Sequence, residues 1–221
     1  QSERFKLIID GDKVDATSNA FTLRNTGAME ILNGGSFSAH DGSVRNYISV
    51  TGEGSYLEYG GNVYGEAPSG AEGAPTYGTA YITVSDGATA NFTNLSIGGE
   101  GASRENRRGS VTLSNATATA KTILLSLANE DEEIRAELSV ENSSLTAETI
   151  TSYGAFNVSG TSTLNIDTLN IGTQEPQDDP MLLLDNAVTL LDGAVLTDSN
   201  VGGIVSTEGD VTIAGATTLG Q

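Results

Sequence analysis

The sequence contains no cysteine and no tryptophan, one histidine, four prolines and only 5% aromatic residues. Without cysteine no disulfide can form, so stability must come from a packed core, and the redox compartment stays open. One histidine without cysteine excludes the usual zinc ligand sets. His40 stands next to Asp41 and close to Ser43, but a catalytic triad is an arrangement in space that adjacency does not supply. We therefore expect no metal, no cofactor and no catalytic residue.

Basic residues are also scarce. Ten Lys and Arg face 29 Asp and Glu, which gives a formal net charge of −19. Nucleic-acid binding needs Lys and Arg clusters to neutralise phosphates, so this balance argues against it and against adsorption to anionic membranes. No apolar run approaches the roughly 20 residues that span a bilayer. With 37% hydrophobic residues the chain is nevertheless too apolar to be disordered.

What the sequence has in place of helical periodicity is a repeated unit of variable length. Two short alternating apolar strands flank an Asx, Gly or Ser turn, a third apolar strand follows, and a loop ends the unit. Four copies align, at residues 82–97, 111–125, 138–150 and 156–171. Successive first strands are separated by 29 (82 to 111), 27 (111 to 138), 18 (138 to 156) and 26 (156 to 182) residues. Internal repetition of this kind favours a solenoid.

Two all-β architectures fit alternation with a period of two. In a sandwich or barrel of hairpins, tight turns would join neighbouring strands and the unit would repeat in pairs. In a parallel β-helix, each unit is one coil of about three strands, and each strand stacks on its equivalent in the next coil. The step lengths suit one coil with loops of variable size, and small residues such as Ala118, Ala120 and Ala147 suit a narrow core. We predict the parallel β-helix as a single domain over residues 1–221.

Weaker copies extend the repeat in both directions, to roughly nine or ten coils. On the N-terminal side we assign one copy to Leu7, Ile8 and Ile9. A second begins at residues 21–23 and continues to Met29 and Ile31, and a third runs from residues 48–50 to Tyr56 and Tyr59. On the C-terminal side, one copy begins at residues 182–184 and continues to Leu190 and Val195, and the last contains Ile204, Val211, Ile213 and Leu219.

The longest connectors follow the third strand of the unit, at residues 60–80, 98–109, 128–137 and 172–180. If the coils stack in register, these loops project from one corner and build one face. Solenoids commonly bind ligands through such a face. The alternative is that insertions are simply tolerated wherever they leave the stack undisturbed.

Tyrosine is concentrated around the first of these connectors. Tyr64 and Tyr77 lie within it, and Tyr59 and Tyr81 lie at its edges. Tyrosine rings can stack on sugars and provide contact area at low entropic cost, so these four residues are candidates for a glycan platform. Tyrosine is equally common at the ends of strands, which is the alternative explanation.

The only basic cluster consists of Arg104, Arg107 and Arg108, in the second connector. It can receive a carboxylate or a sulfate, or it can pair with the acids of neighbouring loops. The acidic runs at residues 130–133 and at Asp178 and Asp179 lack the spacing of known calcium loops and are expected to be solvated.

With its repeats aligned, the chain resembles the passenger region of bacterial autotransporters, which are secreted arrays of Gly-, Asn-, Ser- and Thr-rich coils. The four strong copies and the segments at residues 33–37 (NGGSF) and 84–88 (VSDGA) carry the resemblance. It implies a right-handed parallel β-helix, export to the bacterial cell surface, and adhesion to a glycan or protein of a host or neighbouring cell, with self-association possible. It also implies membrane attachment only through a C-terminal barrel outside this sequence, so we expect a segment of a longer secreted protein.

A weaker resemblance is to pectin-degrading β-helix enzymes. Of the polygalacturonase motifs, only the Asp-Asp pair has a counterpart here, at Asp178 and Asp179, and the Gly-His-Gly and Arg-x-Lys motifs are missing. Paired carboxylates can serve glycoside hydrolysis. A polysaccharide-active enzyme that uses surface carboxylates is therefore the alternative to an adhesin or structural stalk.

Overall fold

The chain winds into a stack of parallel coils. The computed structural model describes residues 5–11, 15–24, 27–65, 79–98, 108–126, 136–171, 188–201 and 205–219, and the structural statements that follow concern these residues. One strand from each coil joins a first sheet, in the order β1 (Phe5–Asp10), β4 (Gly27–Leu32), β7 (Tyr47–Thr51), β9 (Thr79–Ser85), β11 (Arg108–Ser114), β13 (Ala136–Glu141), β15 (Ala155–Ser159), β17 (Val188–Leu190) and β20 (Val205–Thr207).

A second sheet takes the next strand of each coil, in the order β2 (Asp15–Ser18), β5 (Ser36–Ala39), β8 (Tyr56–Val63), β10 (Thr89–Ile97), β12 (Thr117–Leu125), β14 (Ser144–Ser152), β16 (Thr161–Ile171), β18 (Val195–Thr197) and β21 (Thr212–Ala214). Four shorter strands complete it: β3 (Phe21–Leu23), β6 (Gly42–Val44), β19 (Asn200–Val201) and β22 (Thr218–Leu219). Every strand pair is parallel.

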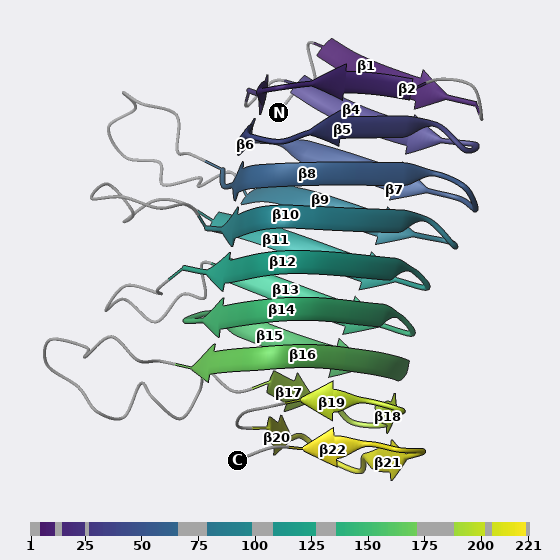
Figure 1. Ribbon diagram of the computed structural model, residues 1–221, viewed down its shortest axis with the longest axis vertical. Coiled ribbons are helices and arrows are strands. Elements are labelled where there is room, and N and C mark those ends of the chain that lie inside the picture. The colour runs from purple at the N-terminus through teal and green to yellow at the C-terminus, as the bar shows by residue number, and fades with distance from the viewer. Residues whose placement is uncertain are drawn as a thin grey trace, which may run out of the picture.

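The coil is right-handed, as Figure 1 shows. Far strands of the first sheet run to the right, the chain turns toward the viewer, and near strands of the second sheet run back to the left as the stack descends from the N-terminus. This is the hand that parallel connections in one sheet almost always take. The predicted right-handed parallel β-helix is confirmed, and the nine strands of the first sheet agree with the expected number of coils. Within the described ranges, no helix is long and apolar enough to cross a membrane.

In the coils from β2 to β16, the second-sheet strand bends at its middle, and the part beyond the bend forms a third strand segment. In β10, Ala90 and Phe92 point into the core, the alternation breaks at Thr93 and Asn94, and Leu95 and Ile97 are buried beyond the break. In the first two coils the same bend separates β2 from β3 and β5 from β6, whereas β18 and β19 both pair with the part of β16 that precedes its bend. The unit of three strands predicted from the sequence is therefore present.

Apolar side chains stack in columns along the axis. One column passes through the first sheet in strict register and consists of Met29, Ile48, Ile82, Val111, Leu138, Phe156 and Val188. Each of these side chains is at most 1% exposed. Burial of apolar area is the main stabilising term of folding, so the columns hold the coils together while the outward positions are free to vary.

Buried hydroxyl groups link the coils at the turn between the two sheets. Ser143 Oγ accepts a hydrogen bond from the backbone N–H of Ala116 at 3.0 Å and donates one to the carbonyl oxygen of Glu141 at 2.6 Å. The same two-way pattern recurs at the buried Ser55, Ser162 and Ser199 and at the partly buried Thr217. These hydroxyls satisfy turn amides that the sheet ladders do not reach, as buried backbone groups require.

Two of the weaker copies were assigned to the wrong coil position. Residues 21–23 form β3, the third segment of the first coil, whereas Met29 and Ile31 lie in β4 and pair with Leu7 and Ile9. On the C-terminal side Phe156 pairs with Val188, a step of 32 residues (156 to 188), so the first strand of that coil is β17 and residues 182–184 lie outside the described part. Alternation alone fixes which side faces inward, but not which strand of a coil a short apolar segment forms.

Candidate functional site

The long connectors all occupy one position in the coil. They join β8 to β9, β10 to β11, β12 to β13 and β16 to β17, and residues 66–78, 99–107, 127–135 and 172–187 within them lie outside the described residues. In other coils the same junction takes two residues, at Arg45 and Asn46 and again at Tyr153 and Gly154. We call the flanking strand ends, which lie along one side of the stack, the connector edge. The shared position predicted for the variable connectors is confirmed, although β8 continues to Val63, past the expected start of the first connector.

Tyr59 and Tyr64 do not form the expected glycan platform. Tyr59 is fully buried in β8, where its hydroxyl donates to the carbonyl oxygen of Asn62 at 3.1 Å. Burial raises the pKa of Tyr59 far above its usual range, and the nearby Asp41 adds to this rise. Tyr64 is 7% exposed, and the guanidinium carbon of Arg45 lies 5.1 Å from its ring centroid. The prediction that these two rings contact a ligand is therefore corrected: both are part of the packed interior.

Tyr81 does present its ring at the surface. It lies near the start of β9, on the outer face of the first sheet beside the connector edge, and is 43% exposed. Its ring stacks on that of Tyr47 in the preceding coil, with centroids 5.8 Å apart and planes inclined by 11°. Tyr47 was not singled out in the sequence, although both tyrosines precede the same repeat position (Tyr47-Ile48 and Tyr81-Ile82) and the aligned copies contain that signal.

The residues that continue this row leave the Tyr81 ring accessible on its second side. Ser110 of β11 follows Tyr81 in register, and Glu137 of β13 follows Ser110. Because serine is short, the space above it lies between the Tyr81 ring and the Glu137 side chain, two coils apart. Glu137 Oε1 accepts a hydrogen bond from Ser139 Oγ at 2.9 Å, which fixes the position of the carboxylate. We call Tyr47, Tyr81, Ser110 and Glu137 the tyrosine row.

Arg108 is the one member of the predicted arginine cluster that the structure places. It is half-buried at the start of β11, pairs with Thr79 in register, and exchanges backbone hydrogen bonds with Gly65. It therefore lies diagonally across from Tyr81, at a separation that long side chains can bridge. Tyr77, Arg104, Arg107, the acidic run at residues 130–133, Asp178 and Asp179 lie outside the described residues.

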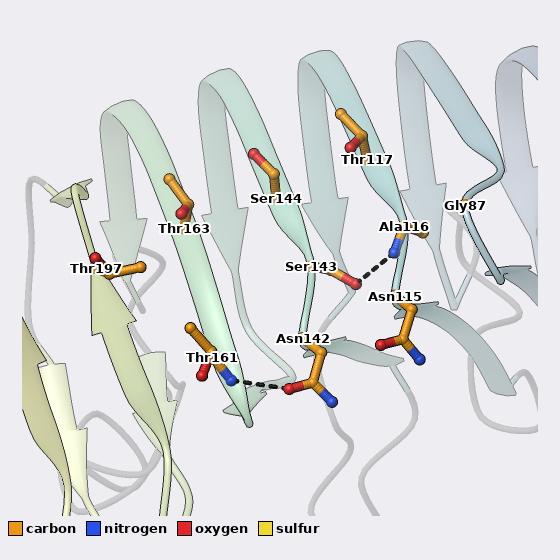
Figure 2. A pocket seen from close by; sticks show the side chains of 10 residues that line it. All are labelled: Gly87, Asn115, Ala116, Thr117, Asn142, Ser143, Ser144, Thr161, Thr163 and Thr197. Carbon is orange, nitrogen blue, oxygen red and sulfur yellow. Dashed lines mark hydrogen bonds between the residues drawn. The ribbon is translucent and has the colours of Figure 1, made fainter. Parts of the chain in front are cut away.

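A shallow groove of about 410 Å³ lies on the opposite side of the stack, at the turn between the two sheets. Figure 2 shows that its lining comes from one turn after another, with Thr117, Ser144 and Thr163 forming an upper row and Asn115 and Asn142 a lower one. None of the ten described lining residues is ionisable. Sequence reasoning missed this groove, although the recurrence of Asx residues at the turns was a signal for it.

Asparagine at these turns adopts a left-handed backbone conformation, with φ of 51° at Asn115 and 47° at Asn142. Asn and Asp tolerate this conformation better than other non-glycine residues. Asn142 Oδ1 accepts a hydrogen bond from the backbone N–H of Thr161 at 2.9 Å, one coil further on. The amide of Asn142 is therefore held in place, with its nitrogen left as a donor.

Across the described segments, no group of three or more His, Cys, Asp or Glu residues is arranged to hold a metal ion. His40 is exposed after β5. Comparison of the chain with family models, with curated proteins and with solved structures gives no match.

Proposed function

We propose that this chain is a secreted or cell-surface β-solenoid of the adhesin type, which binds glycans through the tyrosine row at the connector edge. The observation that supports the proposal is the exposed Tyr81 ring, stacked on Tyr47 and open toward Ser110. An exposed aromatic ring costs free energy in water, and its apolar face is complementary to the C–H face of a pyranose. The polar groups around it suit the hydroxyls at the rim of such a sugar.

Rigid support favours binding at this position. The Tyr81 backbone N–H donates to the carbonyl oxygen of Asn46 at 2.8 Å, and its neighbours Ala80 and Ile82 are fully buried. The ring is therefore carried by a strand whose other face belongs to the core, so little conformational entropy is lost when a ligand binds. Variable connectors beside a constant platform would let related chains change ligand without changing the fold.

The test is a glycan-array and host-protein binding assay with the wild-type chain and the Tyr81→Ala variant. We expect the variant to lose binding to at least one class of glycan that wild type binds. Tyr56→Ala is the matched control, because Tyr56 is a partly exposed tyrosine in β8 on the second sheet, away from the tyrosine row. A second variant with residues 66–78 replaced by a short Gly-Ser linker measures the contribution of the first connector. Equal binding by wild type and Tyr81→Ala would refute the proposal.

A further inference from the structure

The groove at the turn is physically separate from the tyrosine row. Tyr81 lies at the start of a first-sheet strand, whereas the groove lies where first-sheet strands end and second-sheet strands begin. In Figure 1 these are the two opposite sides of the stack, with the turns at the right. A ligand in the groove would therefore contact none of the residues on which the adhesin proposal rests.

Three hydroxyl groups and one amide that line the groove make no hydrogen bond within the described residues, whereas Asn142 Oδ1, Ser143 Oγ and Thr197 Oγ1 each have a partner there, as do the threonines just outside the groove. Thr119 Oγ1 donates to Asn91 Oδ1 at 3.0 Å, and Thr122 Oγ1 donates to Asn94 Oδ1 at 2.9 Å, both on the surface of the second sheet. By contrast, the hydroxyls of Thr117, Ser144 and Thr163 take part in no hydrogen bond within the described part of the chain, and the same holds for the Asn115 side-chain amide.

The free groups repeat once per coil. Thr117 pairs with Ser144 and Ser144 with Thr163 in register, so their hydroxyls are separated by the spacing of parallel strands, about 4.8 Å. The lining spans five successive coils, from Gly87 after β9 to Thr197 in β18. A ligand that satisfies all of these groups must repeat its own hydroxyls at nearly the same interval along the axis of the stack. A linear chain of β-1,4-linked pyranose residues comes close, since each residue advances by about one strand spacing. Successive residues are flipped, but each one presents hydroxyl groups toward both edges of the chain.

The charge of the protein favours neutral polysaccharide chains over anionic ones. The groove lining is uncharged, yet the protein carries a net charge of −19. The resulting potential repels uronate and sulfate groups, and no Lys or Arg side chain among the lining residues offsets it. A neutral polysaccharide experiences no such repulsion, and it can form hydrogen bonds with the hydroxyl and amide groups of the groove.

We propose that the groove binds a neutral linear polysaccharide along the solenoid axis, with one sugar residue per coil. The turn is already ordered by the Asn142–Thr161 hydrogen bond and by the buried Ser143 hydroxyl, so binding needs little rearrangement. About five sugar residues fill the five coils, and the open ends at Gly87 and Thr197 allow a longer chain to continue in both directions.

Isothermal titration calorimetry with neutral β-1,4-linked gluco- and manno-oligosaccharides of two to six residues tests the proposal. Affinity is expected to rise with length up to about five residues and then level off. Thr117→Val keeps the shape and strand propensity of threonine but removes its hydroxyl, and should weaken binding roughly 2- to 10-fold, the worth of one hydrogen bond. The double variant with Thr163→Val should weaken it further.

Thr119→Val is the matched control, since Thr119 lies two residues along the same strand on the same outer surface and already has a partner. It should bind as wild type does, and oligogalacturonates should bind none of the variants. Tyr81→Ala should leave titrations at the groove unchanged, which separates this proposal from the adhesin proposal. Absence of binding by neutral chains, affinity independent of length, or equal losses in Thr117→Val and Thr119→Val would each overturn it.

Discussion

The side-chain oxygen of Ser143 accepts a hydrogen bond from the backbone N–H of Ala116, 27 residues earlier in the sequence and one coil away in the stack, at 3.0 Å. Ser143 is 5% exposed and Ala116 is 6% exposed, so water does not compete for this N–H. At the turn, a side chain therefore accepts the backbone hydrogen bond that links two coils, whereas along the strands backbone carbonyl groups accept it.

Replacing Ser143 by alanine should destabilise the chain by about 1–3 kcal/mol, because the Ala116 N–H is left buried without an acceptor. Ser144→Ala is the control, since Ser144 is the next residue, points outward and makes no side-chain hydrogen bond within the described residues. That change should stay within about 0.5 kcal/mol of wild type. Urea unfolding curves of the three proteins check the difference, and similar midpoints for both variants would contradict it.

The left-handed conformation of Asn115 gives a prediction about the turns. Its φ is 51°, and no hydrogen bond to its side chain is found in the described ranges, so substitution there tests mainly the backbone. Asn115→Gly should be as stable as wild type to within about 0.5 kcal/mol, because glycine adopts this conformation freely. Asn115→Val should lose about 1–2 kcal/mol, because a side chain branched at Cβ crowds the backbone in this conformation and lacks the polar group with which asparagine tolerates it. Thermal unfolding of both variants measures this, and a valine variant as stable as the glycine variant would disprove it.

Burial of Tyr59 predicts loss of stability in alkali. Its pKa is raised in the folded protein and lies near 10 in the unfolded chain. Above about pH 10 the unfolded chain therefore releases a proton that the folded chain keeps, and the free energy of unfolding falls as pH rises. Tyr59→Phe should cost about 1 kcal/mol at neutral pH, from the lost bond to Asn62, and should show a shallower decline above about pH 10. Urea unfolding of wild type and Tyr59→Phe at a series of pH values measures this. If the free energy of unfolding falls equally steeply with pH in both proteins, the prediction is wrong.

The stack of Tyr47 on Tyr81 predicts an indirect effect on binding. Tyr47→Ala removes the ring that holds Tyr81 in place and should weaken glycan binding about 2- to 10-fold, in line with the 0.5–1.5 kcal/mol typical of an aromatic pair. The loss should be smaller than that in Tyr81→Ala, and Tyr47→Phe should restore wild-type affinity. The affinities of wild type and the three variants for the strongest ligand on the array test this prediction. If Tyr47→Phe binds that ligand as weakly as Tyr47→Ala does, the Tyr47 hydroxyl and not the ring stack supports binding.

Much of the fold could be read from alternation. Strong copies such as those beginning at Ile82 and Val111 were aligned correctly, because their apolar residues alternate without interruption and the turns between them contain Asx or Gly. The weak copies failed for a physical reason. Pairing partners in the first sheet lie between 17 (Val188 to Val205) and 34 (Ile48 to Ile82) residues apart, so a short apolar segment can be shifted along the coil without violating local alternation.

For the candidate site, too, some features follow from alternation in the sequence and others only from the stacking of coils. Leu57 and Tyr59 share one face of β8, so the alternation already contained the burial of Tyr59, although its position beside a connector suggested the surface. Tyr81 was identified correctly as a surface residue near the connector edge, but its partner Tyr47 lies 34 residues away and meets it only when the coils stack.

By itself, then, the sequence determined the repeated unit, the inward and outward faces of its strands, and the one junction at which length varies, because each depends on residues close together in the chain. Only the tertiary structure decided which tyrosines stack, and that the turns form a groove whose lining includes hydroxyl and amide groups without a partner among the described residues. These properties depend on neighbours one coil away, and their identity is set by how many residues each coil contains.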